Sequence, residues 1–114
     1  MTVGEIVKAL SLEVLAGSSH LERPVTGGYA SDLLSRVMAG AKAGNVWVTL
    51  QAHPNVVAVA SLLDLAAVVV GEGTPVEPET RERAEEKGVV LLTTAHDTFT
   101  VVAGLAGLGL QGAC

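Results

Sequence analysis

The chain has 114 residues, of which 49% are hydrophobic and only 3% aromatic, and its formal net charge at pH 7 is −5. This length is typical of one domain, and folding at this size buries enough surface for a core without disulfides or metal. The negative charge argues against a nucleic-acid partner, because nucleic-acid binding needs a basic surface. With three aromatic residues in all, Val, Leu and Ala must build the core.

The sequence shows neither the features of export nor those of a membrane span. Its one cysteine, Cys114, cannot form an intramolecular disulfide, and the N-terminus lacks the basic start and long apolar run of a signal peptide. The apolar segment 56–70 is interrupted by Asp64 and is shorter than the roughly 20 residues that a span requires. We therefore expect a cytoplasmic protein with no membrane partner.

The N-terminal part of the chain predicts one helix and two extended segments. Thr2 and Glu5 have the spacing of a capping box, which predicts a short helix directly after Thr2. Residues 12–15 predict a short strand, and residues 25–30 predict an extended segment that contains a glycine pair. The short first strand is expected to join the sheet at an edge.

A helix is predicted to begin at Ser31 or Asp32, where the period of the apolar residues changes to that of a helix. Gly44 is predicted to cap its C-terminus in a left-handed conformation. The apolar residues that define this period are Leu33, Leu34, Val37, Met38 and Ala41.

The middle of the chain predicts a strand, an unusually apolar helix and a second strand. Residues 46–50 and 67–70 are rich in valine and predict strands. Between them, Pro54 suits the first position of a helix from Asn55 to about Leu65. This helix is apolar on nearly all sides, so a sheet should cover one side and more protein, such as a neighbouring subunit, the other.

The C-terminal part predicts a charged helix, a strand and an apolar helix. The charged helix runs from about Pro78 to Lys87, packs through Thr80 and Ala84, and is capped by Gly88. Its expected i,i+4 ion pairs are Glu79–Arg83 and Arg81–Glu85. Residues 89–92 predict the last strand, and the inner face of the final helix is expected to contain Phe99, Val102, Leu105 and Ala106. Several glycines follow, so the last residues are expected to fray.

Strands and helices thus alternate along the whole chain. This alternation is typical of an α/β fold in which right-handed crossovers join parallel strands. We predict one domain, residues 1–114, with a mostly parallel sheet of about five strands in a three-layer arrangement, with helices on both faces.

Polar links at the predicted strand ends indicate a ligand site. In open parallel sheets, ligands bind outside the carboxyl ends of the strands, and the helix N-termini there favour anions. The pattern predicts a small anionic or nucleotide-like ligand and identifies no cofactor. The candidate binding residues are Thr26, Gly27, Gly28, Ser31, Asp32, Gln51, His53, Asn55, Thr94 and His96, with Thr93 and Asp97 beside them.

Structural roles compete with this interpretation. Asp32, Asn55 and Thr94 can each simply begin a helix. The pair Gly27-Gly28 belongs to neither a GxGxxG motif nor a Walker loop, so a bulge or a close backbone approach is favoured over a phosphate cradle. His53 and His96 have no metal-ligand spacing, and no catalytic nucleophile stands out.

Two segments resemble the DRTGG domain family: residues 25–35 (VTGGYASDLLS) and residues 44–60 (GNVWVTLQAHPNVVAVA). The similarity extends from about Val3 to Leu108, but Pro24 and Val25 replace the Asp-Arg of the naming motif. The resemblance implies a fold similar to the N-terminal domain of HPr kinase/phosphorylase. It also implies an accessory or regulatory module without catalytic residues, which in certain pyrophosphatases helps to form a dimer.

The sequence therefore predicts a non-catalytic regulatory module that self-associates as a homodimer and senses a small anionic or nucleotide ligand. Two alternatives stay open. One is a small enzyme that uses His53, His96 and an Asp at the carboxyl ends of the strands. The other is a purely structural subunit of a larger complex.

Overall fold

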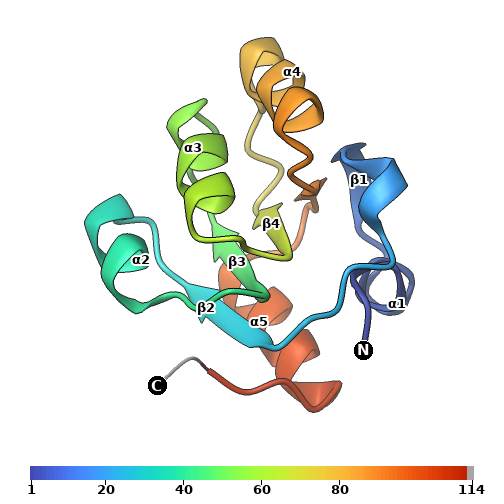
Figure 1. Cartoon of the computed structure of the whole chain (residues 1–114). Coiled ribbons are helices and arrows are strands. Elements are labelled where there is room, and N and C mark those ends of the chain that lie inside the picture. Colours follow the sequence, from blue (N-terminus) through green and yellow to red (C-terminus); the bar gives the residue numbers. More distant parts are fainter. Residues whose placement is uncertain (113–114) are drawn as a thin grey trace.

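A five-stranded sheet forms the centre of the computed structural model, which describes residues 1–112 (Figure 1). The strand order is β1-β5-β4-β3-β2; β2 to β5 are parallel, and β1 is antiparallel to β5 at one edge. The strands are β1 (Glu13–Ala16), β2 (Gly27–Ala30), β3 (Asn45–Thr49), β4 (Ala67–Val70) and β5 (Leu91–Thr93). The expectations for Cys114 and for fraying at the end of the chain fall partly outside the described residues.

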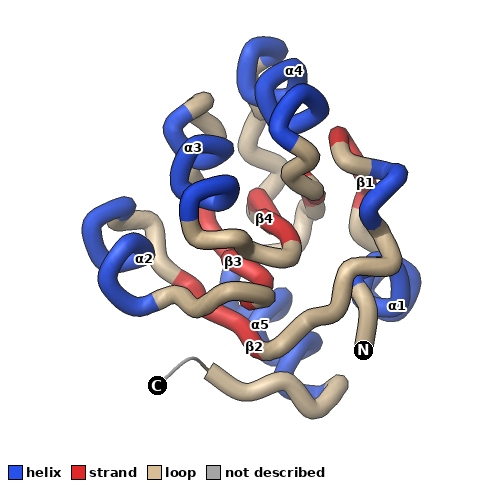
Figure 2. Tube along the Cα trace, viewed as in Figure 1, coloured by secondary structure: helices blue, strands red, loops and turns tan. Residues whose placement is uncertain are grey.

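Five α-helices and one short 3-10 helix surround this sheet (Figure 2). They are α1 (Val3–Leu10), η1 (Ser18–His20), α2 (Leu34–Gly40), α3 (Asn55–Leu62), α4 (Pro78–Lys87) and α5 (Thr98–Gly107). The crossover helices α2, α3 and α4 cover one face of the sheet, and α1 and α5 cover the other. The predicted three-layer α/β fold is confirmed. Within residues 1–112, none of these helices has the length and hydrophobicity to span a membrane.

The core consists of two apolar clusters, one on each face of the sheet. Successive side chains of a strand point to opposite faces, so β3 sends Trp47 towards α2–α4 and Val46 and Val48 towards α1 and α5. In β4, Val68 and Val69 divide in the same way. As expected from the composition, nearly all of the buried hydrophobic residues are Val, Leu or Ala.

Several local predictions are confirmed. Thr2 and Glu5 form both hydrogen bonds of the capping box at the start of α1. Helix α4 has the predicted bounds, its buried residues are Thr80 and Ala84, and Gly88 (φ +67°) caps it in a left-handed conformation. These signals are local in the chain, which is why sequence alone specifies them.

The predicted bounds of the helix after β2 are wrong at both ends. Helix α2 begins at Leu34, because the side chain of Asp32 makes hydrogen bonds to β3 instead of capping a helix. The helix ends at Gly40, since Ala41 is extended. Gly44 (φ +82°) therefore lies in the turn before β3 and is not a helix cap.

The predicted inner face of α5 is also wrong in part. Val101 and Leu105 are buried, whereas Phe99 and Val102 are 82% and 40% exposed. A helix that is apolar on all sides gives no sequence signal for which side faces the sheet.

Helix α3 is flanked by α2 and α4. Its apolar sides are therefore covered by helices of the same chain. It ends at Leu62, a little before the predicted Leu65, and Asp64 has a left-handed conformation (φ +56°).

Only one of the two predicted ion pairs of α4 forms within the described residues. The carboxylate of Glu79 pairs with Arg83 at 3.1 Å. The carboxylate of Glu85 instead accepts a hydrogen bond from the backbone N–H of Gly17 at 3.1 Å, which joins α4 to the end of β1.

Candidate functional site

Asp32 ties the carboxyl ends of β2 and β3 together. Its Oδ1 accepts hydrogen bonds from the hydroxyl of Thr49 at 2.9 Å and from the backbone N–H of Leu50 at 2.7 Å. In return, the side-chain amide of Gln51 donates to the carbonyl oxygen of Asp32 at 2.9 Å. Asp32 and Gln51 thus lie at the predicted edge, but these hydrogen bonds already engage them.

Replacing Asp32 with alanine is expected to lower the free energy of unfolding by about 1–3 kcal/mol, because the fully buried Thr49 loses its charged acceptor. Asp32→Asn keeps an oxygen acceptor and should lose about half as much. Urea denaturation of the three proteins measures this. No loss in either variant would show that the acceptor does not stabilise this end of the sheet, and equal losses would show that a neutral amide oxygen does not replace the carboxylate.

Other candidates at this edge have local structural partners. The hydroxyl of Ser31 accepts a hydrogen bond from the N–H of Leu33 at 3.2 Å. His53 Nδ1 accepts from the N–H of Asn55 at 3.1 Å, so this imidazole lies at the start of α3. Asn55 is the first residue of that helix and is exposed.

Gly27 and Gly28 begin β2 and Thr26 precedes them, so Thr26 lies at the amino edge of the sheet, opposite to His53 and His96. The hydroxyl of Thr26 donates to the carbonyl oxygen of Ala43 at 2.9 Å, before β3 begins. A Cβ on Gly27 would lie 2.7 Å from the carbonyl oxygen of Gln111. The interpretation of this glycine as a site of close backbone approach is confirmed.

The chain connections switch faces between β4 and β5. After β4 the chain goes to α4 on one face of the sheet, and after β5 it goes to α5 on the other (Figure 1). Such switch points are where open α/β sheets bind ligands. Two hydrogen bonds join the loops here: Glu72 N–H donates to the His96 carbonyl at 2.8 Å, and Gly73 N–H donates to the Thr94 carbonyl at 2.9 Å.

A surface depression of about 450 Å³ lies beside these joined loops. A second depression of about 300 Å³, towards α1 and α5, shares Ser11 and His96 with the first. Both volumes lie within the range of about 300–1,000 Å³ that is usual for small-molecule sites. The first is lined by Ser11, Glu13, Gly73, Thr93, Thr94, Ala95 and His96.

Ser11 and Glu13 of this lining were not among the predicted site residues. They come from the end of α1 and from β1, and β1 pairs with β5 in antiparallel register, Glu13 opposite Thr93. Sequence spacing gives no signal for this contact, because it depends on which strand occupies the sheet edge.

The charges around His96 are mostly negative. Hydrogen bonds from the Thr100 side chain and backbone N–H lower the pKa of Asp97, and the nearby His96 lowers it further. Asp97 caps α5 through that backbone N–H at 2.7 Å. Glu13 is exposed at the same depression, and no Lys or Arg side chain is among the residues that line it.

His53 and His96 follow strands that are separated by β4. Two strand spacings correspond to about 10 Å. The two imidazoles are therefore held on different loops and are not hydrogen-bonded to each other. Across residues 1–112, no group of three or more His, Cys, Asp or Glu side chains is placed to hold a metal ion.

Comparison with known proteins gives the family. The sequence profile of the DRTGG domain matches residues 5–108. The chain belongs to the DRTGG domain family. This membership agrees with the parallel sheet and with the resemblance of segments 25–35 and 44–60. No curated protein matches the chain significantly.

A similar solved structure contains the CBS and DRTGG domains of the regulatory region of Clostridium perfringens pyrophosphatase, complexed with the activator diadenosine tetraphosphate. The TM-score is 0.71 and the sequence identity 19%, over 91% of this chain and 47% of that chain. This DRTGG-domain chain therefore spans about half the length of that structure, and the likeness shows the fold.

Proposed function

We propose that this chain is a cytoplasmic, non-catalytic regulatory module that binds a nucleotide, acts as a homodimer, and signals the bound state to a partner or a further domain. The observation that carries the ligand proposal is the depression around His96 at the point where the connections switch faces. Membership in the DRTGG family supports a regulatory role. The similar pyrophosphatase region is complexed with a dinucleotide activator, which supports a nucleotide over other anions.

The charges of the site indicate which form of the nucleotide binds. Glu13 and Asp97 would repel free phosphate groups, and no Lys or Arg side chain lines the depression to offset this repulsion. A nucleotide that carries Mg²⁺ presents a smaller net charge and places a cation between phosphates and carboxylates. We therefore expect binding of the Mg²⁺–nucleotide complex in preference to the free nucleotide.

A thermal-shift assay with ATP, diadenosine tetraphosphate and inorganic phosphate, each with and without Mg²⁺, tests this proposal. A ligand at about 100 times its Kd stabilises a protein by about 2.7 kcal/mol, which corresponds to a Tm rise of about 10 °C for a chain of this size. We expect this rise for a nucleotide with Mg²⁺ and little change for inorganic phosphate.

The two histidines of this edge provide a matched control. His96→Ala should abolish the shift, because His96 lines the depression, whereas His53→Ala should keep it. Absence of a shift for every nucleotide, or loss of the shift in His53→Ala alone, would contradict the proposed site.

A further inference from the structure

Helix α5 presents an apolar stripe to solvent. We define the α5 stripe as Phe99, Val102, Ala103 and Ala106, which have the spacing i, i+3, i+4, i+7 on one helix face. All four residues are exposed, and Phe99 is the most exposed of the large hydrophobic residues described, at 82%. An exposed apolar patch of this kind on a small domain marks an interaction surface.

An apolar depression of about 240 Å³ lies next to this stripe, between α5 and the edge strand β2. It is lined mainly by Tyr29, Val102, Leu105, Ala106 and Leu110. Phe99 and Ala106 are seven residues apart on α5, which is about 10 Å along the helix axis. The same surface therefore carries a protruding aromatic ring and a cavity large enough for one.

We propose that this surface is the contact between two copies of the chain, with the α5 helices antiparallel across a two-fold axis. In such an interface, residue i of one copy contacts residue j of the other, and j contacts i. Phe99 of each copy then enters the apolar depression of the other, while the small Ala103 near the axis lets the helices approach. This inference rests on the proposed homodimer and names its surface.

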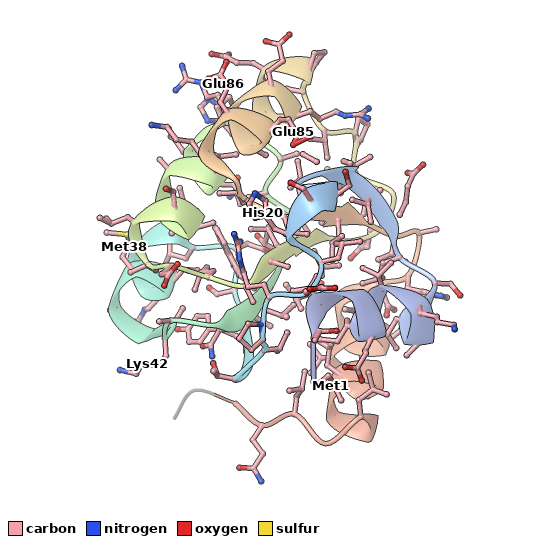
Figure 3. The ribbon with its side chains drawn as sticks, turned by 45° about the vertical axis from the view of Figure 1, so that its right-hand side comes forward. Met1, His20, Met38, Lys42, Glu85 and Glu86 are labelled. Carbon is pink, nitrogen blue, oxygen red and sulfur yellow. The ribbon has the colours of Figure 1, made fainter. Side chains whose placement is uncertain are left out.

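The charge distribution favours a second copy as the occupant. The sequence from Thr98 to Gly112 contains no charged residue, whereas the chain as a whole has a net charge of −5. The α4 side carries acidic groups such as Glu85 and Glu86 (Figure 3). Two identical copies joined through α5 therefore bring together no charged residue of the segment 98–112. A contact through α4 would instead desolvate acidic and basic side chains together, since α4 also carries Arg81, Arg83 and Lys87.

The area also suits a dimer of moderate stability. A buried aromatic side chain contributes about 150–250 Å², so two copies of Phe99 supply about 300–500 Å² of the roughly 1,600 Å² that a standard interface buries. The remainder must come from the stripe, from Leu110 and from the β2 edge. We therefore expect association that depends on protein concentration.

Sedimentation velocity over a range of concentrations tests the inference, with Phe99→Glu and Leu62→Glu as matched variants. Leu62 is 70% exposed and lies on α3, on the opposite face, so it controls for the introduction of a charge at an exposed apolar position. We expect a dimer for the parent and for Leu62→Glu. For Phe99→Glu, the dissociation constant should rise by at least about 30-fold, as for an interface hot spot.

The outcomes separate this inference from the proposed function. A dimer that dissociates in Leu62→Glu but not in Phe99→Glu would overturn the α5 surface and leave self-association intact. A parent that is monomeric at all concentrations would overturn both the surface and the homodimer, and would leave the nucleotide proposal to its own assay. Circular dichroism and the milder Phe99→Ala variant establish that any loss reflects the interface and not unfolding.

Discussion

Trp47→Ala is expected to lower the free energy of unfolding by about 3–5 kcal/mol, because it removes the largest fully buried side chain of the core. Trp47 packs in the cluster beneath α2, α3 and α4, and its indole N–H donates to the carbonyl oxygen of Ser31 at 2.8 Å. Domains of this size have a total stability of about 5–15 kcal/mol, so this one change consumes much of it.

Trp47→Phe serves as the graded control for this prediction. It keeps most of the apolar volume but leaves the Ser31 carbonyl without its donor, which should cost about 1–3 kcal/mol plus a small packing loss. Denaturant unfolding followed by circular dichroism measures both variants, since Trp47 is the only tryptophan and its fluorescence is lost. A parent-like stability of Trp47→Ala would contradict the described core.

Gly17→Ala is expected to cost about 2–5 kcal/mol. Gly17 has φ +80°, a conformation that costs a residue with a Cβ about 1–2 kcal/mol. Its Cβ would also lie 2.7 Å from both Val89 O and Val90 Cα, so the approach to β5 must shift, at about 1–3 kcal/mol more.

Gly73→Ala isolates the conformational part of this cost. Gly73 has a similar left-handed φ of +63°, but a Cβ there meets no atom within 4 Å. Its loss of stability should therefore be about 1–2 kcal/mol. If urea denaturation gives the same loss for both variants, the close contact between Gly17 and the segment before β5 is not a determinant of stability.

The sequence pattern predicts the sheet well because strand formation here depends on local runs of valine and leucine. Segments such as 67–70 contain only residues that fit a sheet covered on both faces, and this strand has the predicted bounds. The capping box of Thr2 and Glu5 and the bounds of α4 are equally local. These features need no knowledge of the rest of the chain.

The missed features all depend on contacts between distant segments. Asp32 is a residue type that commonly caps a helix, but its carboxylate instead accepts hydrogen bonds from Thr49 and Leu50 at the end of the neighbouring strand β3. Phe99 has the side chain of a core residue, but Val101 and Leu105 occupy the side of α5 that meets the sheet. In each case the local pattern allows two outcomes, and tertiary packing selects one.

The candidate site could be predicted only in part for the same reason. Thr94 and His96 follow a predicted strand directly, so their place at the carboxyl edge is readable from the chain. The switch of connections between β4 and β5, and the approach of Ser11 and Glu13, require the strand order and the face of each helix. The sequence therefore indicates that the candidate site lies at the carboxyl ends of the strands, and the fold indicates that it lies at β4 and β5.

An NMR titration of the ¹⁵N-labelled chain with Mg²⁺–diadenosine tetraphosphate is the most direct test of nucleotide sensing at this edge. We expect saturable shifts of the backbone amide signals of Ser11, Gly73, Thr94 and His96, which surround the depression. The amide signal of Gly44, at the opposite edge, should stay unchanged. Absence of saturable shifts, or shifts centred on the segment 26–28 instead, would contradict it.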